Sequence, residues 1–190
     1  MRAVAMLALV TAVYSDVAAS KSSTGRPTAA ALYRALLTTS LRDPKLPAGF
    51  NSASINSATP SNNAKKHHAI GEVEFEIDND HAFITYAVFP NRADAVDDYR
   101  DTRPAGRVIS RLAAPGSLPR PAQILNGSVT GKNGLGKTVT QGLTGLEFVD
   151  ESVVVAVVTA SSSNTDHGDE PGAIRLARLA LDHLRLLRGR

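Results

Sequence analysis

The sequence contains no cysteine and no tryptophan, and each absence excludes a class of site. Without cysteine there is no disulfide framework, no thiolate ligand for zinc, no cysteine nucleophile and no lipid-modified N-terminal cysteine. Aromatic residues make up only 5% of the chain, which argues against a stacking surface for single-stranded nucleic acid. We therefore expect no nucleic-acid partner.

The chain also lacks a large excess of either positive or negative charge. The chain carries 21 Lys and Arg against 18 Asp and Glu, so its formal net charge is only +3 over 190 residues. A balance this close to neutral does not indicate a polyanionic partner. The content of 43% hydrophobic and 21% charged residues is typical of one globular domain.

The longest hydrophobic run lies at the N-terminus. Residues 3–13 form an apolar run of about 11 residues, which suits a signal-peptide core and is shorter than the about 20 residues that span a bilayer. Val17-Ala18-Ala19 supplies the small residues of a cleavage site. The sequence predicts a signal peptide over 1–19 and a secreted or periplasmic domain over 20–190, without a transmembrane segment after processing. An uncleaved N-terminal helix is the alternative.

The first half of the domain contains a helix pattern and a hairpin pattern. Apolar residues recur at helical spacing over about 28–42, and residues 51–66 are polar enough to form a long connection. Residues 72–77 alternate Glu with apolar residues, which predicts a strand with one buried and one solvated face. A turn at Asn79-Asp80 and a return strand over 82–89 place Phe75 opposite Ile84 and Val73 opposite Tyr86.

A short helix follows this hairpin. Asn91 is a good N-cap, Asp94 suits the first turn, and the helix should run to about Asp101. We expect Ala93, Val96 and Tyr99 to face inward.

The second half predicts more strands and a C-terminal helix. Residues 107–112 and 123–129 favour strands, the latter interrupted by a turn at Asn126-Gly127, and the apolar run 153–158 favours a buried strand. The C-terminal helix opens at Pro171 and has one arginine-rich and one apolar side.

The order strand–strand–helix occurs in 72–101 and again in 145–187. It predicts an α+β fold with an antiparallel sheet built from two ββα-like units, helices packed on one face, and an N-terminal helix.

The most specific motif is a match to the phosphate-binding pattern G-x-x-x-x-G-K-[ST] over Gly131–Thr138. Such a loop needs a buried strand before it and a helix after it. Here Gly142 and Gly145 follow at once, and two glycines cost a helix about 2 kcal/mol. We therefore expect a flexible loop that enters a strand, and nucleotide binding is the disfavoured alternative.

Histidines and acidic residues offer weaker signals. His68 and His81 lie at opposite ends of the first hairpin, about 25 Å apart along an extended strand, so they cannot share an ion. Asp166–Glu170 lacks the spacing of a calcium loop and instead suits the cap of the C-terminal helix. Glu72, Glu74 and Glu76 suit a solvated sheet face. We expect no metal site and no cofactor.

No converging catalytic set appears in the sequence, so a non-enzymatic binding protein for a small ligand or an envelope partner is the leading hypothesis. The chosen ligand-binding candidates are His68 and Tyr86. A small cofactor-free enzyme that uses a histidine as acid or base is the alternative. An exposed sheet edge also leaves a homo-oligomer open.

Overall fold

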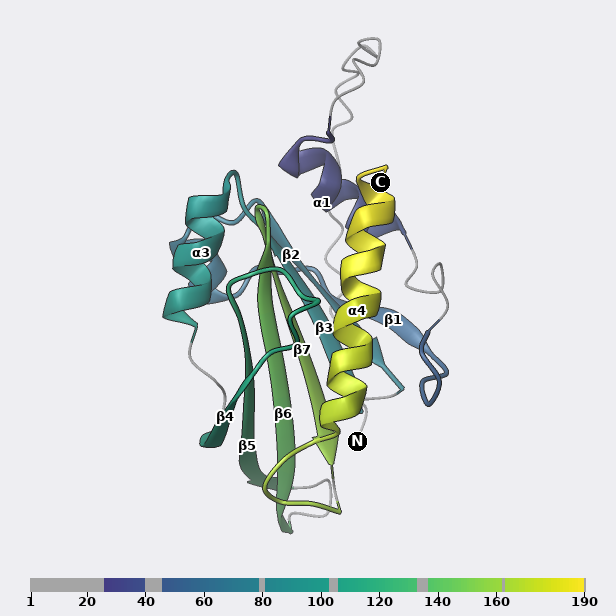
Figure 1. Cartoon of the computed structure of the whole chain (residues 1–190), viewed down its shortest axis with the longest axis vertical. Coiled ribbons are helices and arrows are strands. Elements are labelled where there is room, and N and C mark those ends of the chain that lie inside the picture. Colours follow the sequence, from purple (N-terminus) through teal and green to yellow (C-terminus); the bar gives the residue numbers. More distant parts are fainter. Residues whose placement is uncertain are drawn as a thin grey trace, which may run out of the picture.

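The structure is a computed structural model that describes residues 26–39, 46–78, 81–102, 106–132, 137–161 and 163–189. Its centre is a seven-stranded antiparallel sheet with the order β1-β2-β3-β7-β6-β5-β4 (Figure 1). The strands are β1 (Ala53–Ser57), β2 (Gly71–Ile77), β3 (Ala82–Val88), β4 (Arg107–Ala113), β5 (Ala122–Lys132), β6 (Thr138–Asp150) and β7 (Val153–Ser161). The helices are α1 (Ala29–Thr38), α2 (Asn62–Lys66), α3 (Arg92–Asp101) and α4 (Glu170–Leu187). The predicted α+β class with an antiparallel sheet and an N-terminal helix is confirmed.

One side of the sheet, here called the first face, carries the main core. Alternate residues of the central strands, such as Phe75, Ile84 and Val155, point to this face and are at most 2% exposed. The helices α1 and α4 pack on them. The α4 helix begins where the Asp169 side chain accepts a hydrogen bond from the Gly172 amide at 3.0 Å, which satisfies one of the free N–H groups of the first turn.

The described residues cover the opposite side of the sheet, the second face, only at one end. There α2 and α3 pack on a smaller apolar cluster, which consists of Ala64, Ala87, Phe89, Ala95, Val149 and Val154. The prediction that the helices pack on one face is therefore wrong. Residues 153–158 of β7 are apolar on both faces, so they show no alternation of apolar and polar residues. The sequence pattern therefore could not reveal that a second layer of helices covers part of the second face.

The predicted register of the first hairpin is confirmed. Phe75 lies opposite Ile84 and Val73 lies opposite Tyr86, as expected from apolar pairing across an antiparallel ladder. The predicted turn residues Asn79 and Asp80 lie outside the described residues, as does the predicted signal peptide. The strand–strand–helix order also recurs, but α3 and α4 lie on opposite faces, so two equivalent ββα units are not confirmed.

Residues 51–66 are not the long connection expected from their polar composition. They contain β1, which pairs with β2 at the sheet edge, and α2. Three of the five β1 residues are exposed, because an edge strand packed on few neighbours needs little apolar sequence.

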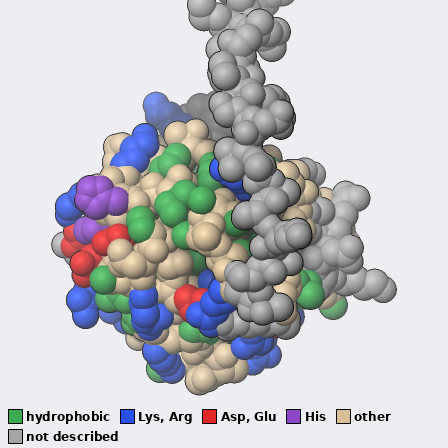
Figure 2. Space-filling model, turned by 90° about the horizontal axis from the view of Figure 1, so that it is seen from above, with side chains coloured by type: hydrophobic (Ala, Val, Ile, Leu, Met, Phe, Trp, Pro, Cys, Tyr) green, Lys and Arg blue, Asp and Glu red, His purple; other side chains and the backbone are tan. Residues whose placement is uncertain are grey.

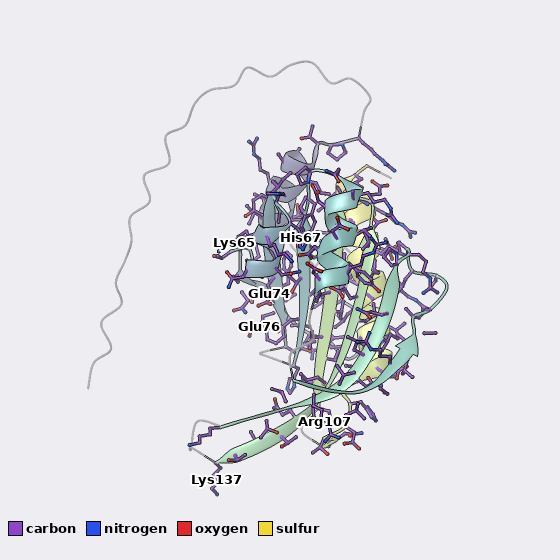
Figure 3. The ribbon with its side chains drawn as sticks, turned by 90° about the vertical axis from the view of Figure 1, so that its left-hand side faces the viewer. Lys65, His67, Glu74, Glu76, Arg107 and Lys137 are labelled. Atoms are coloured by element: carbon purple, nitrogen blue, oxygen red, sulfur yellow. The ribbon has the colours of Figure 1, made fainter. Side chains whose placement is uncertain are left out.

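The predicted turn at Asn126-Gly127 is also wrong, because β5 runs straight through it. Asn126 accepts a hydrogen bond from the Thr144 hydroxyl at 2.7 Å across the ladder. A Cβ atom on Gly127 would lie 2.3 Å from the carbonyl oxygen of Arg107, so this glycine permits the close approach of β4. The far ends of β5 and β6 form an arm that projects beyond the other strands, with Lys137 at its end (Figure 3).

Helix α3 has its predicted cap and bounds, and Val96 and Tyr99 pack against the second-face cluster as predicted, whereas Ala93 does not. The Asn91 side chain accepts a hydrogen bond from the Asp94 amide at 3.0 Å. Ala95 and Asp98 are the buried residues of this helix, whereas Ala93 is exposed. A buried aspartate on the inner side is what a search for apolar spacing misses.

Candidate functional site

The uncovered part of the second face is built from rows of residues that run across the sheet. In one row Glu147 on β6 lies between Gln123 on β5 and Ala156 on β7. In the next row Gly145 lies between Leu125 and Val158. Positions two apart on a strand point to the same face, so both rows lie on the second face. The row of Glu147 forms a polar strip beside the apolar row of Gly145.

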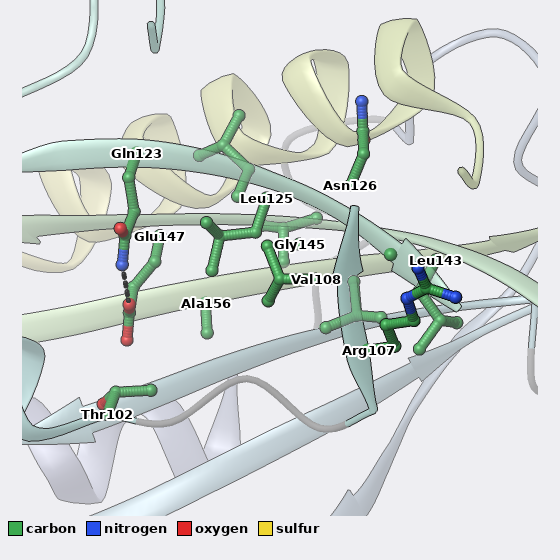
Figure 4. A pocket seen from close by; sticks show the side chains of 14 residues that line it. Thr102, Arg107, Val108, Gln123, Leu125, Asn126, Leu143, Gly145, Glu147 and Ala156 are labelled. Atoms are coloured by element: carbon green, nitrogen blue, oxygen red, sulfur yellow. Dashed lines mark hydrogen bonds between the residues drawn. The ribbon is translucent and has the colours of Figure 1, made fainter. Parts of the chain in front are cut away.

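A cavity of about 230 Å³ lies over these rows (Figure 4). We call it the apolar cavity, because most of the side chains that line it are apolar. Its polar groups are at its ends, with Gln123 and Glu147 at one end and Arg107 at the other (Figure 4). It is lined by Thr102, Arg107, Val108, Gln123, Leu125, Asn126, Gly127, Leu143, Gly145, Leu146, Glu147, Ala156, Val157 and Val158.

Glycine at position 145 contributes to the space in this cavity. A Cβ atom built there would have the carbonyl oxygen of Leu125, 3.9 Å away, as its nearest neighbour. A Cβ atom at this position would therefore make an ordinary van der Waals contact without a clash, and a longer side chain would extend over the floor of the apolar cavity.

Glu147 is the buried charged group of the cavity. It is 8% exposed, and one carboxyl oxygen accepts a hydrogen bond from the Gln123 side-chain amide at 3.2 Å. Burial raises the pKa of Glu147 to about 7, and the nearby carboxyl of Asp98 contributes to the rise. Hydrogen bonds from Gln123 and Thr102 act in the opposite direction on this pKa. Glu147 is therefore poised to gain or lose a proton near neutral pH.

A second cavity, of about 390 Å³, adjoins the first under the C-terminal half of α3. We call it the acidic cavity, because its walls carry the carboxyl groups of Glu72, Asp98, Asp101 and Glu147. Thr102, Glu147 and Ala156 line both cavities. The two cavities thus adjoin at these three residues, and we call the pair the cleft, which is apolar at one end and acidic at the other.

Asp98, in the C-terminal half of α3, is held in position by the side chain of Asn63 on α2. Its Oδ1 atom accepts a hydrogen bond from the Asn63 side-chain amide at 2.7 Å, and the residue is 5% exposed. Burial raises the pKa of Asp98 to about 6. His67 lowers this pKa, whereas the charges of Glu72 and Asp101 raise it. Two carboxyl groups that repel one another, Asp98 and Glu147, therefore face the same cleft.

The outer edge of the acidic cavity carries positive charge, as does the Arg107 end of the apolar cavity. Asp101 binds both the Lys66 ammonium and the His67 ring, the latter at 3.0 Å. Their hydrogen bonds lower the pKa of Asp101. Figure 2 shows histidine, acidic and basic side chains gathered at one side of this end of the molecule.

The sequence candidates His68 and Tyr86 are not brought together. His68 is exposed after α2, on the side of the second face, with a positive φ of 62°. Tyr86 points to the first face, is 0% exposed, and its hydroxyl lies 3.3 Å from Nδ1 of His183 on α4. Phe75 packs edge-on against both rings. Tyr86 therefore belongs to the core under α4.

Glu147 and Asp98 were missed by reasoning from the sequence. The available signal for Glu147 was a carboxylate within the apolar run Leu146–Val149, at a position that faces away from the core. Asp98 lies three residues after Ala95, on the same side of α3. Glu72, which we expected on a solvated face, is half-buried and accepts a hydrogen bond from the Ser61 hydroxyl at 2.9 Å.

The remaining motifs are accounted for by structure. In the phosphate-type motif, Gly131 and Lys132 end β5 and Thr138 begins β6, so a strand follows it, as predicted, and not a helix. In the loop before α4, Asp169 caps the helix as predicted, and Nε2 of His167 lies 2.7 Å from the Asn164 amide.

Within the described ranges, no helix is long and apolar enough to cross a membrane. Over the same residues, no group of three or more His, Asp or Glu side chains could hold a metal ion. No protein-family model matches the chain, and neither the curated proteins nor the solved structures contain a significant match.

Proposed function

We propose that the chain is a small-ligand-binding protein and that its ligand occupies the apolar cavity on the second sheet face. The observation that carries this proposal is a cavity of about 230 Å³ floored by a rigid sheet. Leu125, Leu143 and Val158 remain half-exposed there, whereas α3 closes the other end of the same face. Cavities with an apolar lining and a few placed polar groups are typical ligand sites.

The burial of Glu147 supports the same proposal. A carboxyl group in apolar surroundings lowers the stability of the fold, since its charged form loses solvation. Nothing in the packing of the sheet requires an acid there, because Val149 and Gly145 occupy the neighbouring positions on the same face of β6. Costly ionisable groups of this kind are concentrated at functional sites.

Export is the second part of the proposal and rests on residues 1–19. A cleaved signal peptide would make the protein a secreted or periplasmic binder. Expression in a host with the matching export pathway, followed by N-terminal sequencing, tests it. We expect a mature N-terminus near Ser20, and cytosolic protein that retains Met1 would contradict export.

Blocking the apolar cavity tests ligand binding. Gly145→Leu places a side chain over the floor, and its Cβ atom does not clash with backbone. Gly131→Leu makes the same exchange on the arm, where a Cβ atom meets nothing within 4 Å. Binding of 1-octanol is measured by isothermal titration calorimetry. We expect the unmodified protein and Gly131→Leu to bind alike and Gly145→Leu to bind at least tenfold more weakly, as a filled cavity should. Equal binding by all three proteins, or by none, would contradict the proposal.

A further inference from the structure

We propose that the ligand is a cationic amphiphile, a primary amine whose aliphatic part lies in the apolar cavity and whose ammonium group lies between Glu147 and Asp98. This inference rests on the proposed function and names the class of ligand. Its basis is the arrangement of charge along the cleft formed by the two adjoining cavities.

The shape of the cleft separates a head group from a body. Thr102, Glu147 and Ala156 form the boundary at which the apolar cavity opens into the acidic cavity. A ligand that fills the apolar cavity and reaches this boundary must present a polar group to Glu147. On the opposite wall of the acidic cavity that group meets Asp98.

The hydrogen bonds at this boundary come from neutral donors. Glu147 accepts from the Gln123 amide at 3.2 Å, and Asp98 accepts from the Asn63 amide at 2.7 Å. Amide donors leave the negative charge of a carboxylate uncompensated. An ammonium group would donate to both carboxylates and supply the missing charge.

Basic groups near the acidic cavity are already engaged at its edge. Lys66 and His67 both bind Asp101, and His67 also acts on Asp98 through its charge. Burial raises the pKa of Tyr99 on α3, the charge of Glu147 raises it further, and Arg120 and Arg111 lower it. Glu72 and Asp101 add negative charge around Asp98. The four carboxyl groups that line the acidic cavity favour a cation over an anion on this side of the boundary.

The buried carboxyl groups make binding depend on pH in a defined direction. Burial raises the pKa of both Glu147 and Asp98, so each group is largely protonated at pH 5.5 or below. A bound ammonium favours the ionised form, since an opposite charge lowers a carboxyl pKa. Affinity for an amine should therefore increase with pH, while affinity for a neutral ligand of the same shape should not.

Three ligands of equal chain length test the inference: octylamine, 1-octanol and octanoate, titrated by calorimetry at pH 5.5 and pH 8.0. Octylamine remains a cation at both pH values, because an ordinary alkylamine titrates near the pKa of lysine, about 10.4. We expect octylamine to bind at least tenfold more tightly at pH 8.0 than at pH 5.5, and at least tenfold more tightly than octanol at pH 8.0.

Glu147→Gln is the decisive variant, and Glu76→Gln, in β2 on the same face of the sheet, is its matched control. Glu147→Gln should remove the preference for octylamine and its pH dependence while it retains octanol binding. Glu76→Gln should retain both.

The possible failures are distinguishable. If octanol binds and Gly145→Leu abolishes its binding, but octylamine binds no better or octanoate binds best, the cationic ligand class is wrong and the cavity remains a binding site. Tightest binding of octanoate would place the polar group of the ligand at Arg107 instead. If none of the three ligands binds in a manner that depends on Gly145, the proposed function fails, and the inference fails with it.

Discussion

Replacement of Glu147 by glutamine should stabilise the protein at alkaline pH and leave its stability nearly unchanged in mild acid. The fold raises the pKa of this carboxyl from its ordinary 4.5 to about 7. Between these values the folded state holds a proton that the unfolded state has released, so stability falls as pH rises through the window. At about 1.36 kcal/mol per pH unit the loss is about 3 kcal/mol above pH 7. The neutral amide introduced by Glu147→Gln would avoid this loss and could still accept the hydrogen bond of Gln123.

Urea unfolding at pH 4.5 and pH 8.0 measures this difference, with Glu76→Gln in parallel to correct for removal of one negative charge from the same face. We expect Glu147→Gln to be more stable than the parent protein by about 2 to 3 kcal/mol at pH 8.0 and by less than about 1 kcal/mol at pH 4.5. An equal change at both pH values would refute the reasoning, because it would mean that the buried carboxyl does not titrate in this window.

Three further changes test other parts of the structure. Burial lowers the pKa of His183 from its ordinary 6.5 to about 4, so the parent protein loses stability as pH falls from 6.5 toward 4. In urea unfolding, the free energy of unfolding of His183→Gln should therefore fall by about 2 kcal/mol less than that of the parent protein between pH 7.5 and pH 5. The Arg188 side chain is 4% exposed in its ion pair with Asp150, so Arg188→Met should lower the free energy of unfolding by about 3 kcal/mol. Adding Asp150→Asn to that variant should restore part of the loss, and an equal loss in the single and double variants would contradict the pairing. Tyr86→Phe should cost about 1 kcal/mol but leave octanol affinity unchanged, as should His68→Ala; a tenfold loss in either titration would return the site to these residues.

The fold was predictable wherever one face of an element is clearly apolar and the other polar. The alternation of Val73, Phe75 and Ile77 with glutamates determined the register of the first hairpin. β1 could not be found, since an edge strand with exposed Ser54, Ile55 and Asn56 lacks such a pattern. The second layer of helices was missed because β7 is apolar on both faces, so its sequence does not show which side is covered.

The site was less predictable than the fold, because it depends on residues far apart in the chain. Glu147 and Asp98 are separated by 49 positions and meet only because α3 crosses the end of β6 and β7. His68 and Tyr86 were chosen for their chemistry, yet Tyr86 faces the core under α4, whereas His68 is exposed after α2 on the side of the second face. The sequence did carry one signal of the cleft, the single acid Glu147 within an apolar run, but the prediction did not use it.

Mapping of the ligand position by NMR tests the central claim most directly. Backbone amide shifts of the ¹⁵N-labelled protein are recorded while octylamine is added at pH 8.0. We predict that the perturbed amides cluster on the floor of the cleft, at 123–127, 143–147 and 156–158, and that Gly145→Leu abolishes the perturbation. Perturbations confined to the start of α4 around 167–178, or spread evenly over the surface, would contradict a ligand site on the second face.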